Sequence, residues 1–588
     1  MKYNIREFNS AVEKYKKILG NIKGKSILII IDFMFERAYY STAPLGRAIH
    51  ELGGDVNITV KYGKSEMLDA LNEVLDTYSD MKKGAKNQKT KALNEFISCV
   101  KDDYFEKIFK RPDLIIEATK DGFSGDENLP YLDGWFKKHK WNELIKTSDN
   151  IWKNVYNLKN GERISCGFET IPTAGKLDLP LEDYLDSFPI VMAMAVAARK
   201  KAKVSMGASS PRFSTSDLPE RIGELRATLL GCELTKNVNE KVFVKFKALS
   251  SLLNLSRIKP VDAAFFVHGK GYSGKHIFGE KTGYPSLDRK TRWPSPGSFI
   301  YKLDWYQQTK IDKRSPLARY GFTETLPIDI FIETCNVDWN SMRERNNKII
   351  KIMEKCRIVK VSGEPQKNGI KTEFEVGLIK KNGEHRWARG SDSDTRNKIN
   401  QIYYKRTGIK AGTMANLPGG EMFLTPEYLI GTFAGDVVIS VDQSYILNSE
   451  NPIIVKCSKK GYKILNGPKD IIKKIEKRKN DAWKTILRQE KNKSLPKAII
   501  DSKKKNFQNI GEFAINTNPR AKLCRYLIVN EKIAKMIHIA LGSGFEPDRN
   551  TDYHIDIVIN SPKQKLDIYG TDSEGKKHWI IKKGEFCI

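Results

Sequence analysis

The stretch MIHIALGSGFEPDRNTDYHIDIVI, residues 536–559, decides how the second half of this chain is interpreted. Its two apolar runs are typical of buried β-strands, and each run carries groups that need water, a hydrogen-bond partner or a metal. His538 lies in the first run, and His554 and Asp556 lie in the second. Residues i and i+2 of a strand share a face, so His554 and Asp556 are predicted to converge on one point.

Two glutamates occur in similar settings upstream. Glu421 follows a Pro-Gly-Gly turn and precedes an apolar triplet, and Glu512 lies between Ile510 and Phe513. Three carboxylates beside two histidines are untenable in an apolar setting unless a positive charge lies among them, which predicts a divalent metal site. Carboxylates with imidazoles suit Zn²⁺, Co²⁺ or Mn²⁺, and about five ligands are more than one catalytic metal takes from protein, which favours two ions.

The order of these motifs resembles the aminopeptidase T family of metallopeptidases, the M29 peptidases. The resemblance is continuous from about Leu326 to the C-terminus and rests on the segments NLPGGEMFLTP (416–426), IGEFAI (510–515), HIALG (538–542), the N-x-x-x-H-x-D pattern that ends at Asp556, and LDIYGTDSEGKKHWIIKKGEF (566–586). It implies a dinuclear divalent-metal centre in a C-terminal domain, a homodimer, and removal of N-terminal residues from peptide substrates.

Carried over by position, the resemblance implies five metal ligands, of which Glu512 is also expected to act as general base: Glu421, Glu512, His538, His554 and Asp556. One position departs from the family, which has a tyrosine where this chain has Phe545. A tyrosine hydroxyl can hydrogen-bond a developing oxyanion, and losing one such donor costs roughly 10²–10³ in rate. A metal-binding protein without peptidase activity is therefore an alternative.

The remaining pattern predicts an α/β chain of 588 residues in two domains. Short apolar runs alternate with helical stretches over residues 1–400, which favours an N-terminal α/β domain with a largely parallel sheet. The helix predicted at 336–356 is expected to close that domain, together with the strand after it. Residues 401–588 have short strands and Gly and Pro turns, which favours a mixed α+β, β-rich, metal-binding catalytic domain.

Composition limits the other functions. The formal net charge is +30, and residues 469–505 hold 14 Lys or Arg against 5 Asp or Glu. Apolar residues at helical spacing in that stretch favour an amphipathic surface helix over a nucleic-acid interface, although polyanion binding remains an alternative. Eight cysteines without a C-x-x-C pair, no signal peptide and no apolar run of spanning length predict a cytoplasmic chain without a membrane partner.

One glycine-rich segment resembles a known motif without matching it. The segment HGKGYSGKH (268–276) nearly spells a phosphate-binding loop, but His276 replaces the Ser or Thr that holds Mg²⁺, and a Gly- and Pro-broken segment follows in place of a helix. We expect an ordinary glycine-rich loop there. The family's fold also serves ring-cleaving non-haem iron dioxygenases, and the retention of both Glu421 and Glu512 argues against that activity.

Overall fold

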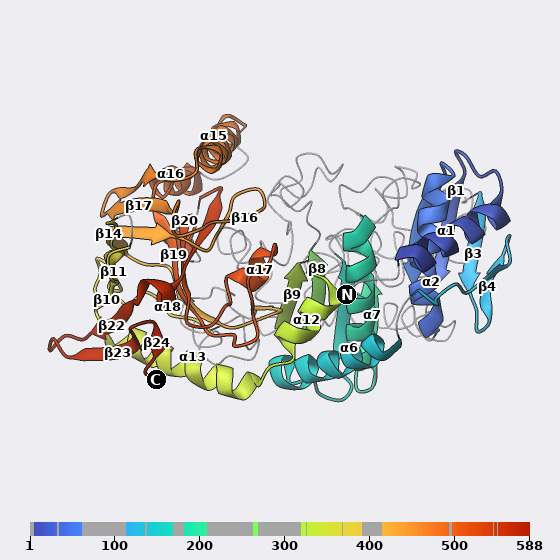
Figure 1. Ribbon diagram of the computed structural model, residues 1–588, viewed down its shortest axis with the longest axis horizontal. Helices are drawn as coiled ribbons and strands as arrows, with labels where there is room; N and C mark the ends of the chain where they lie inside the picture. The colour runs from blue at the N-terminus through green and yellow to red at the C-terminus, as the bar shows by residue number, and fades with distance from the viewer. Residues whose placement is uncertain are drawn as a thin grey trace, which may run out of the picture. The chain divides into compact units, whose positions relative to one another are not determined.

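The computed structural model describes residues 5–31, 35–60, 113–135, 138–168, 181–207, 263–268, 319–324, 326–366, 369–390, 414–492, 497–544, 546–549 and 551–588. The glycine-rich loop predicted after His268 lies outside these residues. The chain forms two compact units, and the main boundary between them falls within α12 (Ile328–Cys335), between Ile332 and Glu333. Both units contain sheets (Figure 1), and buried residues occur in each.

The first unit contains a five-stranded sheet in the order β2-β1-β3-β4-β5. The inner strand β1 pairs in parallel with β2 on one side and β3 on the other, as its continuous apolar run predicts. Ile27 and Ile29 of β1 are fully buried. The elements of this part are α1 (Ile5–Leu19), β1 (Ser26–Ile31), α2 (Glu36–Glu51), β2 (Asp55–Val60), β3 (Leu114–Ala118), β4 (Gly122–Gly125) and β5 (Leu129–Pro130).

Four strands of the same unit, in the order β9-β8-β6-β7, belong to a second five-stranded sheet and pair in parallel with one another. The elements of this part are α6 (Lys138–Ile151), the short π-helical turn η2 (Trp152–Tyr156), β6 (Arg163–Phe168), α7 (Leu181–Arg199), β7 (Lys203–Gly207), β8 (Ala263–His268) and β9 (Arg319–Glu324). The most apolar run of the chain, 188–198, lies within α7, where it is largely buried. No helix among the described residues has the length and hydropathy that crossing a membrane requires.

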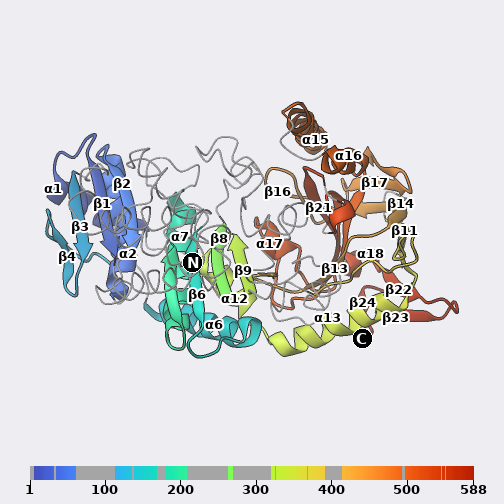
Figure 2. The same cartoon turned by 180° about the vertical axis from the view of Figure 1, so that it is seen from behind.

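The second unit consists mainly of two antiparallel sheets. The larger has eight strands in the order β18-β17-β14-β11-β10-β22-β23-β24, and the smaller has six in the order β13-β19-β20-β21-β15-β16 (Figures 1 and 2). The strands of the larger sheet are β10 (Ile358–Ser362), β11 (Glu373–Gly377), β14 (Tyr428–Gly435), β17 (Ile453–Ser458), β18 (Gly461–Asn466), β22 (Asp567–Thr571), β23 (Lys577–Lys582) and β24 (Glu585–Phe586). Those of the smaller sheet are β13 (Glu421–Leu424), β15 (Val438–Ser440), β16 (Ser444–Ile446), β19 (Ile510–Asn516), β20 (Ile537–Gly542) and β21 (His554–Ile559).

The main core of this unit is shared by the two sheets. Phe374 of β11 contacts Phe433 of β14 and Phe513 of β19 edge to face, with ring centroids 6.1 Å apart in both pairs. Ile539 of β20 and Ile557 of β21 belong to the same buried cluster. One face of the six-stranded sheet is therefore apolar and packed, which leaves its opposite face to carry polar groups.

The helix predicted at 336–356 is observed as α13 (Trp339–Lys355), but it does not close the N-terminal domain. It begins at Asp338, whose side chain accepts hydrogen bonds from the backbone N–H groups of Asn340 and Ser341. Its buried side chains, with those of β10, belong to the core of the second unit. The compact units thus divide earlier than residue 400, because β10 pairs antiparallel with β11 and β22.

The basic stretch forms α15 (Lys469–Lys491), followed by α16 (Lys497–Lys505), which lies beside it in both views (Figures 1 and 2). Ile471, Ile475 and Ile486 of α15 are buried, while Lys473 and Lys477 are exposed. This is the amphipathic surface helix that the apolar spacing predicts. The remaining elements of the unit are β12 (Met414–Asn416), α17 (Leu527–Asn530), the 3₁₀ turn η4 (Pro547–Arg549) and α18 (Ser561–Gln564).

Candidate metal centre

The five predicted ligands come from four strands of the six-stranded sheet and lie on its polar face. The pairing register places Glu421 opposite Asn516, Glu512 opposite Ala540, and Ala540 opposite Asp556. His538 and His554 follow the same alternation on β20 and β21. The intervening residues of these strands point the other way, into the core.

A β-bulge brings Glu512 to this face. The pairing of β19 with β20 steps from Ile510 opposite Leu541 to Glu512 opposite Ala540, which leaves Gly511 as the extra residue. In an uninterrupted strand, Ile510 and Glu512 would share a face, whereas here Ile510 belongs to the core cluster. Gly511 has no room for a side chain, because a Cβ there would lie 2.0 Å from the carbonyl oxygen of Ser543.

The Pro-Gly-Gly turn has a similar role for Glu421. Gly420 adopts a φ of +122°, and a Cβ at this position would lie 2.5 Å from the Cβ of Asn518. The Asn518 amide donates to the carbonyl of Gly419, and the Gly420 carbonyl accepts from the backbone N–H of Thr517. Only glycine fits this close approach, which fixes the start of β13 and with it the position of Glu421.

The ligand atoms form overlapping groups that share Glu512. Glu421, Glu512 and His538 make one group, and Glu512, His554 and Asp556 make another; within each group the ligand atoms lie within 4.8 Å of one another. Glu512 Oε1 lies 3.3 Å from His538 Nε2, and its Oε2 lies 3.3 Å from His554 Nε2. The two oxygens of one carboxylate thus face the two histidines separately, as in a bridging ligand.

Hydrogen bonds orient both imidazoles so that their Nε2 atoms face the carboxylates. His554 Nδ1 donates to the carbonyl oxygen of Ser543, 2.8 Å away, which leaves Nε2 as the lone-pair nitrogen of the neutral ring. His538 Nδ1 lies 2.8 Å from Asn516 Oδ1, which can accept from it in the same way. Such partners fix the tautomer and ring orientation of metal-binding histidines.

The structure adds Glu531 and Lys532, which the sequence interpretation missed. Glu531, which ends α17, forms a third group with His538 and Asp556. Its neighbour Lys532 is fully buried, and its Nζ lies 2.7 Å from both Glu421 Oε2 and Glu531 Oε1. Both residues follow the short helix rather than lying on a strand, so strand periodicity gave no signal for them. Asn516 could have been found, because it shares the alternation of Glu512 along β19.

The charge balance of these residues fits a cation. Four carboxylates (Glu421, Glu512, Glu531 and Asp556) gather around one ammonium, and the two imidazoles are neutral in the metal-binding form. The buried Oδ1 of Asp556 has no hydrogen-bond partner among the described residues, although it lies 3.0 Å from His554 Nε2. A buried carboxylate oxygen in this state costs free energy unless a cation binds it. The oxygen and nitrogen donors suit Zn²⁺, Co²⁺ or Mn²⁺.

The pKa values of Glu512 and His538 also indicate that positive charge is favoured among the carboxylates. Burial raises the pKa of Glu512, but its contacts with His538 and His554 outweigh burial and lower the pKa to about 2. Burial lowers the pKa of His538, yet its contact with Glu512 leaves that pKa raised. A proton on the His538 imidazole therefore supplies positive charge beside Glu512, and a metal ion would compete with that proton for the imidazole nitrogen.

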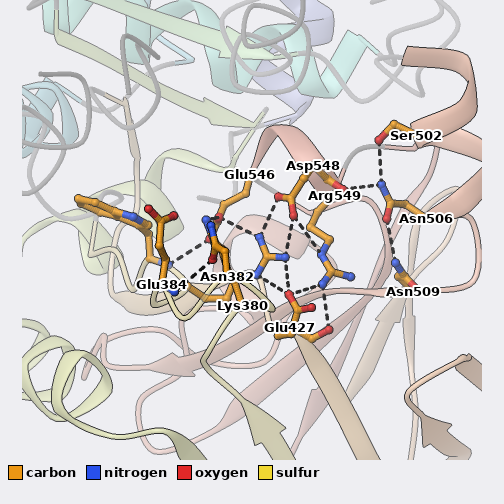
Figure 3. A network of polar contacts seen from close by, with 12 residues as sticks. Lys380, Asn382, Glu384, Glu427, Ser502, Asn506, Asn509, Glu546, Asp548 and Arg549 are labelled. Atoms are coloured by element: carbon orange, nitrogen blue, oxygen red, sulfur yellow. Dashed lines mark hydrogen bonds and ion pairs between the residues drawn. The ribbon is translucent and has the colours of Figure 1, made fainter. Parts of the chain in front are cut away.

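A second polar network involves residues of the segment between β20 and β21 (Figure 3). Arg386, almost fully buried, donates to Glu427, Glu546 and Asp548. Lys380 Nζ lies 2.7 Å from Glu546 Oε2, and Arg549 Nη2 also pairs with Glu427. This Arg386 network ties the segment after β11, which carries Lys380 and Arg386, to Glu427 before β14 and to Glu546 and η4, which precede His554 in the chain.

Tyr553, the neighbour of His554, faces away from the site, as the alternation of side chains along a strand predicts. Its hydroxyl lies 2.7 Å from the hydroxyl of Tyr462 and also contacts the carbonyl of Phe507, and its ring belongs to the core cluster. It therefore offers no hydroxyl to the candidate metal centre. Phe545, the position of the family's tyrosine, lies outside the described residues.

Comparison with known proteins adds little beyond this geometry. No protein-family model matches the chain, and no curated protein matches it. Among solved structures, the chain is similar to wild-type AmpT from Thermus thermophilus, with a TM-score of 0.39 and 13% sequence identity, over 76% of this chain and 99% of that chain.

Proposed function

We propose that this chain is a metal-dependent aminopeptidase, which hydrolyses the N-terminal peptide bond of peptides at a centre of two divalent ions, zinc, cobalt or manganese. The observation that carries the proposal is the position of Glu512 between two ligand groups, with one oxygen toward each histidine. The order of the ligand-bearing segments, which resembles the M29 peptidases, supports the same reaction. A peptide substrate, a homodimer and a cytoplasmic location belong to the proposal.

The residues divide into two sets of ligands that share Glu512. Glu421 and His538 serve one ion, and His554 and Asp556 serve the other. Divalent ions held there supply Lewis acidity to the scissile carbonyl, anchor the free α-amine of the substrate, and lower the pKa of the attacking water. Asn516 and Ser543 keep the imidazoles turned toward the carboxylates, so the chain presents its ligands in advance.

Glu512 was expected to be both ligand and general base, and these two roles compete. Both of its oxygens face imidazole nitrogens, and its side chain is only 4% exposed. The Glu531 side chain is 13% exposed and contributes one oxygen to the third group. We therefore assign metal binding to Glu512 and the role of proton acceptor from the attacking water to Glu531.

The test is release of the N-terminal residue from a panel of aminoacyl amides, with the purified full chain dialysed against each metal in turn. We expect metal-dependent turnover, and its loss in Glu421→Gln and in Glu512→Gln. Glu373→Gln, on an exposed glutamate of β11, is the matched control and should keep the wild-type rate. Equal rates in the wild type and both site variants would refute the assignment. Bound metal without turnover would favour a metal-binding protein that has lost peptidase activity.

A further inference from the structure

Lys532 is the least expected charge in the site. Its side chain is fully buried, and its ammonium lies 2.7 Å from one oxygen of Glu421 and 2.7 Å from one oxygen of Glu531. The backbone also holds it firmly, because its N–H donates to the Val529 carbonyl and its C=O accepts from the N–H of Asn518. A buried ammonium persists only when carboxylates compensate it, so Lys532 and its two partners form one unit.

We propose that Lys532 acts as a built-in cation that makes the two metal positions unequal. The group of Glu512, His554 and Asp556 binds the first ion firmly. The group of Glu421, Glu512 and His538 binds a second ion only weakly, because Lys532 already neutralises Glu421. This inference rests on the proposed metal centre, but it concerns the number and affinity of the ions and holds whether or not the chain cleaves peptides.

The first step of the argument is the sharing of one oxygen. Glu421 Oε2 is the atom that lies 3.6 Å from His538 Nε2 in the first ligand group, and the same atom accepts from Lys532 Nζ at 2.7 Å. A zinc ion binds a carboxylate oxygen at about 2.0–2.2 Å, so an ion on this oxygen would lie within about 5 Å of the ammonium. The repulsion between a divalent ion and an ammonium at that separation weakens binding by several powers of ten.

The second step is the contrast between the three candidate groups. Two of them contain a carboxylate that Lys532 holds, either Glu421 or Glu531. In the remaining group, the ion pairs among the described residues join Glu512 and Asp556 to His554. A neutral imidazole is itself a metal ligand, whereas an ammonium offers no lone pair. Among the described residues, the group of Glu512, His554 and Asp556 is therefore the one that contains no carboxylate held by Lys532.

The experiment is a metal titration of the full chain. Calorimetry with Zn²⁺ and with Mn²⁺, and elemental analysis after dialysis against buffer of controlled free metal, give the number of ions and their affinities. For the wild type we expect one ion per chain to be retained, with a second binding at least ~100-fold more weakly. Two ions of equal affinity in the wild type would overturn the inference and leave the peptidase proposal intact. No binding at all would overturn both.

Variants assign the effect to Lys532. Lys532→Met removes the ammonium and keeps the length of the side chain, so the second ion should bind at least ~100-fold more tightly than in the wild type. The matched control is Lys503→Met, which removes another buried ammonium, paired with Asp552, from α16. It should leave the number of retained ions at one. An unchanged second affinity in folded Lys532→Met contradicts the inference, and if that variant does not fold, the wild-type titration decides.

Discussion

Replacing Arg386 with methionine tests whether the Arg386 network stabilises the second unit. The guanidinium makes five hydrogen bonds to three carboxylates: Nε and Nη2 donate to Glu427, Nη1 donates to Glu546, and Nη1 and Nη2 donate to Asp548. Burial lowers the pKa of Arg386, but these carboxylates outweigh burial and leave it raised. Arg386→Met removes the central cation while filling a similar volume.

The expected destabilisation follows from the partners that remain. Breaking a buried ion pair costs about 3–5 kcal/mol, because it leaves a buried charge uncompensated. Here Lys380 still pairs with Glu546 and Arg549 with Glu427, and the Asp548 side chain is 56% exposed, so the cost should fall near the lower limit. A loss of about 3 kcal/mol corresponds to a Tm lower by about 6–12 °C for a unit of this size.

The assay is thermal unfolding of the full chain, followed by circular dichroism and calorimetry with and without added metal. Arg386→Lys, which keeps the charge but not the planar fork, should lie between the wild type and Arg386→Met. Lys371→Met, which removes an exposed pair with Glu373, should change stability by less than about 1 kcal/mol. If Arg386→Met unfolds within about 0.5 kcal/mol of the wild type, the network does not stabilise this unit.

Three further outcomes are expected. Glu531→Gln should keep its bound metal and lower kcat by roughly 10²–10⁴, because the proton acceptor is lost while the assigned metal ligands remain. Aminoacyl amide hydrolysis and metal content, measured on the same sample, check this. Unfolding measured as a function of pH should show stability lost as pH falls below about 4. Burial raises the pKa values of Glu427 and Asp548, but their contacts with Arg386 outweigh burial and lower both pKa values. The two carboxylates therefore contribute their full stability above the pKa values of the unfolded chain, and this contribution disappears as pH falls through the pKa values of the folded chain. Removing metal with a chelator should lower the free energy of unfolding by about 3 kcal/mol, compared with a sample in which the free metal concentration is 100 times its Kd. The chain should stay folded at 25 °C, and calorimetry measures both outcomes.

Strand periodicity explains which parts of the site could be predicted from sequence. His554 and Asp556 lie two residues apart on β21, and the observed 3.0 Å between them follows directly from that spacing. The parallel strands of the first unit also follow from their apolar runs. In both cases the information lies within a few neighbouring residues.

The unpredicted parts depend on longer-range geometry. The bulge at Gly511 decides which face Glu512 occupies, and it arises from the pairing of β19 with β20 rather than from the residues IGEF alone. The position of α13 was mistaken for the same reason. The helix itself was predicted, but whether it packs on a parallel sheet or joins the core that contains β10 and β11 is set by strand pairing across the second unit.

Lys532 and His538 together compensate the charge of this acidic face. The Lys532 ammonium neutralises part of the charge on Glu421 and Glu531, and a protonated His538 compensates Glu512, whose pKa is lowered to about 2. A metal ion that binds at the proposed centre would displace the proton from His538. It could not displace the Lys532 ammonium, which is part of the chain and stays beside Glu421. The charge that compensates Glu421 would therefore also limit how firmly the Glu421 side holds an ion.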